Sequence, residues 1–303
     1  MTANSEAQSR ALWRRVARFA RKPYREKRIT IGVWWTQVFP HTPLPIRLED
    51  GRWWLLRNDV CGQEVLLGRF EQAEFGFVQS YLRPGMTVLD IGAHHGFYTL
   101  LASRKVGPAG RVIAFEPSPR ERKLLGWNLR INRCRNVTVE PYALAAADGT
   151  ATLFQVAGRE TGCNSLRKPN VGEAMVELTT GTRCLQGVLR EKAINRVDFV
   201  KLDAEGAELE ILKGASRLLT DPPRPVMLVE VQGIRTRPWG YEAAEIIAFL
   251  EERDYVWFRP LPNSRLERVD SGQRALEGNF VAVPRERSGV LMRRCRFWAG
   301  SSQ

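Results

Sequence analysis

The sequence has few cysteines and no long apolar segment. Its 5 cysteines are dispersed among 303 residues, and no two of them form a CxxC pair or a zinc-ligand spacing. An odd, scattered set of thiols predicts reduced cysteines in a cytoplasmic protein rather than a disulfide framework. No run approaches the roughly 18 apolar residues of a membrane-spanning helix, and the N-terminus lacks the apolar stretch of a secretory signal. We therefore expect neither a disulfide-stabilised secreted protein nor an integral membrane protein.

Acidic residues are in the minority. Asp and Glu number 33 against 46 Lys and Arg, which gives a formal net charge of +13. A basic protein attracts nucleic acids and anionic membranes. The arginines, however, are spread along the chain, and no zinc finger, helix-turn-helix or RNA-binding signature accompanies them. We therefore predict no nucleic-acid partner.

Residues 1–69 are predicted to form an extension with a basic helix and a β-hairpin. The stretch 10–28 is basic, and its apolar residues have helical spacing: Leu12, Val16 and Phe19. Pro23 should end or kink this helix. We expect the helix to pack on its own domain, because its apolar stripe is short. A weak, peripheral contact with a membrane surface is the alternative. Asp50-Gly51, between apolar segments, predicts the hairpin.

From residue 87 onward, apolar segments alternate with helical patterns. The predicted strands are 87–91, 111–115, 136–140, 197–202, 226–231, 255–259 and 279–283. The predicted helices are 70–82, 96–104, 119–132, 207–219 and 241–252, and segments 151–156 and 175–180 have further β character. Repeated β-α units predict an α/β fold over residues 70–284, with a doubly wound, mostly parallel, seven-stranded Rossmann-like sheet. A basic, loosely attached tail is expected over 285–303.

The first motif is Asp90-x-Gly92-x-x-x-Gly96, between an apolar strand and a helix. Gly92 lets the backbone turn tightly and approach a ligand, and Gly96 lets the helix lie close to the strand. A dinucleotide fingerprint needs a glycine at position 94, where this chain has His94. Asp90 would repel a pyrophosphate but suits a cofactor with a cationic amino-acid end. The loop predicts a nucleotide-type cofactor other than a dinucleotide.

The second motif is Glu116, which ends the next strand in Phe115-Glu116-Pro117. An acid in this place can accept hydrogen bonds from both hydroxyls of a ribose. A surface acid without a ligand is the alternative. Together with the glycine loop, Glu116 predicts a ligand that contains adenosine.

The third motif is an acidic box, Asp203-Ala204-Glu205-Gly206-Ala207-Glu208, between a buried strand and a helix. Glu208 has a simple structural explanation, because acids in a first helical turn complement the helix dipole. Asp203 and Glu205 need partners or a ligand, because carboxylates near a buried strand end are costly when unpaired. Glu230 ends the following strand, so it points to the same crevice at the carboxyl edge of the sheet.

The order and spacing of these boxes resemble the FkbM family of class I methyltransferases. The matching segments are 90–96, 115–117, 203–208, 212–214 and Glu230, and the resemblance covers residues 70–283. The family usually has asparagine where His94 stands. The resemblance implies S-adenosyl-L-methionine as the cofactor and methylation of a hydroxyl on a sugar, glycolipid or natural product. The implied cofactor-binding residues are Asp90, Gly92, Ala93, His94, Gly96, Glu116, Ala143, Leu144 and Asp203.

Methyl transfer to a hydroxyl benefits from a general base within hydrogen-bond reach. We expect Asp203 or Glu205 to orient or deprotonate the acceptor, with Glu230 assisting. The alternatives are that these acids only hold the loop, or that His94 or His95 is the base. The three acids could also bind a hard cation, but nothing in their spacing demands one, and we predict no metal.

Three other functions are alternatives to this one. A non-catalytic binding protein would be expected to have lost cofactor residues, but Asp90, Gly92, Gly96 and Glu116 are all present here. A nucleic-acid methyltransferase would need a polar-aromatic box to hold an extruded base, but the acidic box stands in its place. His94 disfavours a dinucleotide oxidoreductase. We expect acceptor specificity to reside in the N-terminal region, in residues 158–171 and in the segment after Glu230, because fold does not determine substrate.

Overall fold

The computed structural model describes residues 13–14, 16–269 and 276–294, with side chains described up to residue 289. The chain divides into two compact units, Met1–Phe70 and Glu71–Gln303. No helix in these described ranges is long and apolar enough to cross a bilayer. Leu12 of the predicted basic helix lies outside the described residues.

The N-terminal unit contains a hairpin covered by helices. Its elements include α2 (Tyr24–Val38), β1 (Leu44–Arg47), β2 (Trp53–Leu56) and α3 (Val60–Leu67). The strands pair antiparallel around Gly51, which has a φ of 85°, as the Asp-Gly pair predicts. Residues 16–20 are helical and α2 begins after Pro23, so the predicted basic helix is interrupted at that proline. The membrane contact of this region stays a prediction.

Close packing holds α2 to the rest of its unit. A methyl group on Gly32 would lie 2.8 Å from the Leu66 side chain and 3.0 Å from that of Leu56. The buried Arg28 donates to the carbonyl oxygens of Arg47 and Leu66 at 3.2 and 3.3 Å. The sequence did not predict α3.

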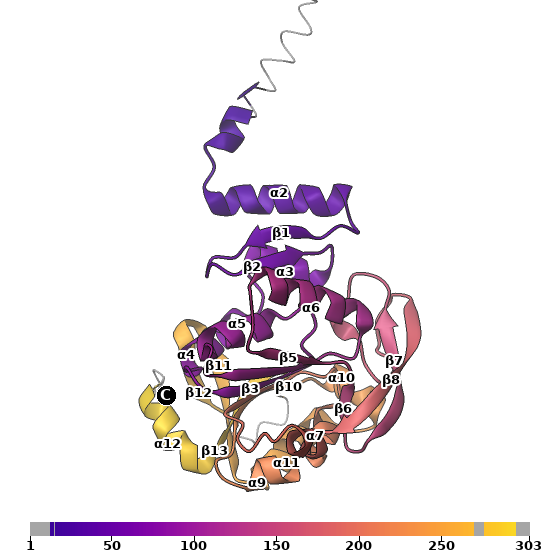
Figure 1. Ribbon diagram of the computed structural model, residues 1–303, viewed down its shortest axis with the longest axis vertical. Coiled ribbons are helices and arrows are strands. Elements are labelled where there is room, and N and C mark those ends of the chain that lie inside the picture. The colour runs from indigo at the N-terminus through magenta and orange to yellow at the C-terminus, as the bar shows by residue number, and fades with distance from the viewer. Residues whose placement is uncertain (1–12, 15, 270–275, 295–303) are drawn as a thin grey trace, which may run out of the picture. The chain divides into compact units, whose positions relative to one another are not determined.

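The second unit is built on an eight-stranded sheet (Figure 1) with the order β12-β11-β13-β10-β9-β3-β4-β5. Its strands are β3 (Thr87–Ile91), β4 (Arg111–Phe115), β5 (Val137–Glu140), β9 (Phe199–Leu202), β10 (Val226–Val231), β11 (Tyr255–Leu261), β12 (Arg265–Arg268) and β13 (Gly278–Pro284). The five strands from β10 to β5 are parallel, and the three at the other edge pair antiparallel. The doubly wound α/β fold is confirmed, but the prediction of seven strands is wrong. The missed strand is β12, whose alternating Arg-Leu-Glu-Arg sequence is short and mostly polar.

Helices cover both faces of this sheet. On one side lie α4 (Gln72–Tyr81), α5 (Phe97–Val106) and α6 (Pro119–Ile131); on the other lie α7 (Leu185–Glu191), α9 (Ser216–Thr220) and α11 (Ala243–Glu251) (Figure 1). The second side holds the main core, in which Ile91, Leu202 and Val229 pack with α7 and α11. The helix predicted over 207–219 is split into α8 (Glu208–Lys213) and α9. Gly214 lies at this break, where a methyl group would come within 2.7 Å of the Ala145 carbonyl oxygen.

A three-stranded sheet lies outside the main one. It contains β6 (Ala143–Ala145), β7 (Gly149–Val156) and β8 (Met175–Cys184) in the order β6-β8-β7. The segments 151–156 and 175–180, which show β character in the sequence, belong to its long antiparallel pair. The 3-10 turn Thr161–Cys163 lies in the connection between these two strands.

The prediction of a loosely attached tail from residue 285 is wrong for its first part. Residues Arg285–Arg294 form helix α12. Glu286 forms an ion pair with Arg224, and Arg287 donates to the Arg224 carbonyl oxygen at 2.6 Å and to the Tyr81 hydroxyl at 2.9 Å. A basic residue that looks solvated in the sequence thus finds partners at the end of α4 and just before β10. Residues 295–303 lie outside the described residues.

The strand order locates the ligand crevice. From β3 the chain goes to β4 on one side of it, and later returns to β9 on its other side. In open α/β sheets, ligands bind at such a switch point, beyond the carboxyl ends of the strands. The glycine loop follows β3 and the acidic box follows β9, so both motifs lie at this point.

Candidate active site

The glycine loop lies directly against the acidic box. Gly92 has a φ of 80°, and a methyl group there would lie 1.7 Å from the Asp203 carbonyl oxygen. The backbone N–H groups of Gly92 and Ala93 donate to the Phe115 carbonyl oxygen at 3.1 and 3.0 Å. At Gly96, with a φ of 90°, a methyl group would lie 2.4 Å from Leu125 Cδ1 on α6. Both glycines are therefore required by close approach as well as by backbone conformation.

His94 joins the loop to two other parts of the site. Its φ is 49°, and its N–H donates to Glu116 Oε2 at 2.7 Å. Its Nε2 lies 3.0 Å from the Thr161 hydroxyl, and its ring stacks on that of His95 with centroids 3.7 Å apart. Asparagine and histidine are both enriched among the non-glycine residues that adopt a left-handed backbone. The departure from the usual asparagine therefore keeps the conformation of the loop.

Glu116 and Asp90 are buried carboxylates on either side of the loop. Glu116 accepts backbone hydrogen bonds from Ser118 at 2.8 Å and from His94 at 2.7 Å. Burial raises the pKa of Glu116 to about 8 and that of Asp90 to about 6. Asp90 accepts a hydrogen bond from the Thr99 hydroxyl. Each carboxylate oxygen can accept a second hydrogen bond, so ribose hydroxyls and an ammonium group suit these two acids.

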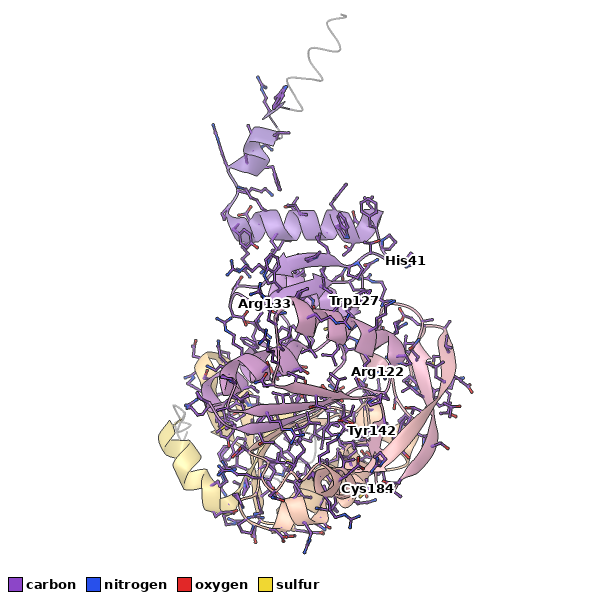
Figure 2. The ribbon with its side chains drawn as sticks, in the orientation of Figure 1. His41, Arg122, Trp127, Arg133, Tyr142 and Cys184 are labelled. Atoms are coloured by element: carbon purple, nitrogen blue, oxygen red, sulfur yellow. The ribbon has the colours of Figure 1, made fainter. Side chains whose placement is uncertain are left out.

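Helix α6 fixes the strand end that carries Glu116. Arg122, which is labelled on α6 in Figure 2, donates to the carbonyl oxygens of Glu116 and Pro117 at 2.8 and 2.9 Å. Asn128, on the same helix, donates to the His95 carbonyl oxygen at 2.9 Å. The loop and the β4 end are therefore held by one helix.

The raised pKa of Glu116 predicts a pH dependence of stability without cofactor. Between its ordinary value of 4.5 and about 8, the folded protein binds a proton that the unfolded chain does not. This contribution to stability is complete below pH 4.5 and is lost as the pH rises to 8, by roughly 3 to 5 kcal/mol. In Glu116→Gln, the unfolding free energy should therefore fall less between pH 5 and pH 8 than in the wild type.

Urea unfolding at several pH values measures this difference. Glu177→Gln, which removes an exposed carboxylate on β8, is the control and should follow the wild-type curve. Parallel curves for Glu116→Gln and the wild type would show that Glu116 is ionised in the folded protein.

The acidic side chains from β9 and β10 meet beside the loop. One oxygen each of Asp203, Glu205 and Glu230 lie within 4.8 Å of one another. Lys201 donates to Asp203 Oδ2 at 2.9 Å, and Arg235 Nε lies 2.9 Å from Glu205 Oε2. Burial raises the pKa of Glu205 and of Glu230 well above the ordinary range, and the charge of Asp203 adds to both shifts. These carboxyl groups therefore hold a proton more firmly than an ordinary glutamate does, and each is a stronger base once it is ionised.

The backbone of the acidic box is held in an uncommon conformation. Glu205 has a φ of 54° and Gly206 a φ of 100°. A methyl group on Gly206 would lie 2.2 Å from the Arg235 carbonyl oxygen. Ser165 donates from its hydroxyl to the Glu205 carbonyl oxygen at 2.7 Å. A left-handed glutamate persists only when its surroundings fix it, and such residues cluster at functional sites.

Glu208 lies in the first turn of α8, the position that the sequence predicted for it. It is buried, and its Oε1 accepts a hydrogen bond from the Ala204 N–H at 2.7 Å. Burial raises its pKa to about 7. Ala143 and Leu144, also predicted to bind cofactor, are both buried: Ala143 packs with Leu153 in a small cluster, and Leu144 lies in the main core. Their contact with cofactor stays a prediction.

Sequence reasoning missed the cations of this site. Lys201 is buried in β9, donates to Asn279 as well as to Asp203 at 2.9 Å, and has a pKa raised mainly by Asp203. The sequence did contain a sign of this role, because Lys201 is a lysine inside an otherwise apolar strand. Arg235 comes from α10 (Gly233–Thr236), in a segment whose sequence gave no sign of this contact.

Three features lie at the switch point of this doubly wound sheet: the glycine loop, the buried Glu116 and the carboxylates after β9 and in β10. Together they define a class I methyltransferase. The family model described as the Methyltransferase FkbM domain matches residues 90–257, more than half of the chain. The protein belongs to the FkbM methyltransferase family, and its cofactor is S-adenosyl-L-methionine. The buried acids Asp90 and Glu116 fit this molecule, which carries an ammonium group and ribose hydroxyls.

The similar proteins include two curated relatives. Methyltransferase sdnD of Sordaria araneosa is 27% identical over 197 residues, which cover 55% of this chain and 73% of the fungal protein. AMB antimetabolite synthetase AmbE of Pseudomonas aeruginosa is 29% identical over 182 residues, which cover 48% of this chain and 8% of AmbE. This chain therefore matches most of the first relative and a small part of the second.

Among solved structures, the FkbM methyltransferase from Methylobacillus flagellatus KT is 17% identical, with a TM-score of 0.42. The match covers 75% of this chain and 56% of that one. The chain thus spans little more than half of this bacterial protein.

Proposed function

We propose that this methyltransferase methylates a hydroxyl group on a sugar, glycolipid or natural product. The observation that carries the proposal is the meeting of Asp203, Glu205 and Glu230 within 4.8 Å, next to the cofactor loop. A hydroxyl is a weak nucleophile while it holds its proton, so an acceptor of this kind needs a nearby base. A relative whose name describes an antimetabolite synthetase supports a small-molecule acceptor.

The proposed mechanism assigns a separate task to each part of the site. S-adenosyl-L-methionine, when bound, supplies a methyl group on a cationic sulfur. Asp90 and Glu116 would hold its ammonium and ribose ends, and the backbone of Gly92 leaves room for it. Positioning contributes most of the rate in such a displacement, because the reacting atoms must be brought into line.

The carboxylates would then act on the acceptor. Asp203 or Glu205 would accept a hydrogen bond from the acceptor hydroxyl and take its proton as the methyl group exchanges its bond to sulfur for a bond to the acceptor oxygen. Glu230 would assist, because its oxygen lies within 4.8 Å of theirs, a separation that one bridging water can span. Lys201 keeps Asp203 oriented through their 2.9 Å contact. A high pKa makes Glu205 a stronger base once it is ionised.

The same charges disfavour a nucleic-acid substrate. A phosphate brought to this crevice would face Asp203, Glu205 and Glu230, and its negative charge would oppose the ionisation of these acids. The segments predicted to set specificity supply Thr161, which contacts His94, and Arg235, which contacts Glu205. We propose that the acceptor is read by the turn Thr161–Cys163 and by α10.

A binding assay followed by a labelling assay tests the proposal. S-adenosylhomocysteine should raise the melting temperature, since a ligand that binds only the folded state stabilises it, and NAD should not. Extracts containing glycans, glycolipids and small metabolites are then incubated with the enzyme and cofactor carrying a deuterated methyl group. We expect mass spectrometry to place the label on oxygen. Label on nitrogen, carbon or nucleic acid would contradict the proposal.

A further inference from the structure

Carboxylates outnumber cations where β9 and β10 end. Asp203, Glu205, Glu208 and Glu230 all act on one another electrostatically, and the cations that face them are Lys201 and Arg235. Arg235 is partly exposed, whereas Glu230 and Lys201 are buried. Buried charges in proteins are paired with opposite charges or coordinate metals. With four acidic side chains and two cationic ones, this crevice can accommodate a further cation.

Glu230 is the clearest sign of a missing partner. Its side chain lies in a residue that is only 7% exposed, and its Oε2 accepts no hydrogen bond from any described residue. The large majority of buried polar atoms in proteins have a hydrogen-bond partner, so a buried oxygen without one requires an explanation. Glu230 points to the place where Asp203 and Glu205 each present an oxygen.

The contacts of the other two acids leave ligand atoms available. Lys201 occupies Oδ2 of Asp203, and Arg235 lies against Oε2 of Glu205. Each carboxylate has a second oxygen. Oxygen ligands about 2.1 Å from a magnesium ion in an octahedral shell are separated by roughly 3 to 4 Å, and separations of up to 4.8 Å allow that shell with small side-chain rotations.

We propose that Asp203, Glu205 and Glu230 bind a divalent cation such as Mg²⁺ or Mn²⁺ at the mouth of the cofactor crevice. Carboxylate oxygens are the ligands that these hard cations prefer. The proposal revises the expectation drawn from the sequence, in which the spacing of the acids did not demand a metal. The reason is that their convergence depends on the pairing of β9 with β10, which places Val229 beside Leu202.

The ion would also give the proposed methyl transfer a further source of rate. A divalent cation lowers the pKa of an oxygen bound to it. An acceptor hydroxyl bound to this ion would lose its proton to one of the surrounding carboxylates more readily. Such an ion would also hold that oxygen in a fixed position, which restricts the acceptor to groups with a coordinating hydroxyl or a neighbouring pair of hydroxyls.

A second group of side chains, His94, His95 and Glu121, also has ligand atoms within 4.8 Å of one another. Two of its members are already engaged. Arg120 Nε donates to Glu121 Oε2 at 2.7 Å, and His94 Nε2 lies 3.0 Å from the Thr161 hydroxyl. The carboxylate cluster is therefore the stronger cation site, and a variant of Glu121 separates the two.

The test measures ion binding without acceptor or turnover. The full chain is treated with EDTA, freed of it and titrated with Mn²⁺, while electron paramagnetic resonance reports the free ion. We expect one Mn²⁺ per chain, displaced by excess Mg²⁺. Glu230→Gln and Asp203→Asn should each weaken binding by at least ~10-fold. Losing a residue that only hydrogen-bonds to a metal ligand already costs that much affinity, and these two residues would be ligands themselves. Glu210→Gln, an acid of α8 paired with Lys213, and Glu121→Gln should bind as the wild type does.

Melting curves without metal keep the test decisive. Glu230→Gln removes an unpaired buried carboxyl group, so its metal-free form should be at least as stable as the wild type. Three results overturn the site: no saturable binding at millimolar Mn²⁺, binding that survives both Glu230→Gln and Asp203→Asn, or binding lost only in Glu121→Gln. The proposal concerns the crevice of the proposed methyl transfer, but ion binding and product labelling are separate measurements, so either can fail alone.

Discussion

Replacing Glu205 by glutamine should lower kcat by ~10²- to 10⁴-fold, the range that general acid–base catalysis typically contributes. The substitution keeps the size of the side chain and removes its ability to take a proton. Glu205 is held against Arg235 at 2.9 Å, and its backbone is fixed by Ser165 and by its left-handed conformation. The glutamine side chain should therefore stay in place, so that the loss reports chemistry and not a moved loop.

The binding of S-adenosylhomocysteine separates the two roles of the acidic box. It should change by no more than ~3-fold in Glu205→Gln and Asp203→Asn, because an interaction made only with the reacting acceptor affects kcat and not ground-state binding. Glu210→Gln is the matched control: Glu210 belongs to the same stretch of acids but pairs with Lys213 on the outer side of α8. Normal turnover in both Glu205→Gln and Asp203→Asn would mean that these acids only shape the loop.

The parts of the site that the sequence predicts are those fixed by local backbone requirements. Gly92 and Gly96 can be predicted because a tight turn from a strand into a helix, with other atoms close to its backbone, needs glycine. Asp90 and Glu116 follow from their places at strand ends, and apolar segments predict seven of the strands of the main sheet within one or two residues. Each of these features depends on neighbours in the sequence, so that a single chain displays them.

The parts that the sequence does not predict depend on partners far along the chain. Arg235 reaches Glu205 from a helix after the next strand, and Thr161 reaches His94 from the connection between β7 and β8. Nothing in the local pattern around Arg235 differs from that of a solvated arginine. Such contacts follow from the order of strands in the sheet and from loop conformation, which periodicity does not encode.

The wrong predictions about the chain's last third have the same cause. Arg285–Arg294 is rich in basic residues, which predicts a solvated tail, yet Arg287 finds the Arg224 carbonyl oxygen and the Tyr81 hydroxyl. The edge strand β12 has one buried residue, Leu266, and it joins the sheet through its antiparallel pairing with β11. Tertiary partners override weak local preferences in both cases.

Gly92→Ala is expected to be the most damaging small substitution in the second unit. The new methyl group would lie 1.7 Å from the Asp203 carbonyl oxygen, a backbone atom that cannot rotate away. The left-handed backbone costs alanine about 1 to 2 kcal/mol, and forcing extra atoms into a packed site typically adds about 1 to 3 kcal/mol. The unfolding free energy should therefore fall by roughly 2 to 5 kcal/mol, and binding of S-adenosylhomocysteine should be lost with the loop geometry.

Gly85→Ala isolates the steric part of this effect. Gly85 precedes β3 with a φ of 84°, close to the 80° of Gly92, but nothing lies within 4 Å of the position that a methyl group would take. Its substitution should cost only the backbone term, about 1 to 2 kcal/mol, and should leave S-adenosylhomocysteine binding intact. Urea unfolding and calorimetric titration of the two variants give the comparison. Equal losses in both would mean that left-handed conformation alone demands glycine at position 92. A larger loss in Gly92→Ala, accompanied by loss of cofactor binding, would show that the approach of the loop to Asp203 joins the cofactor site to the catalytic acids.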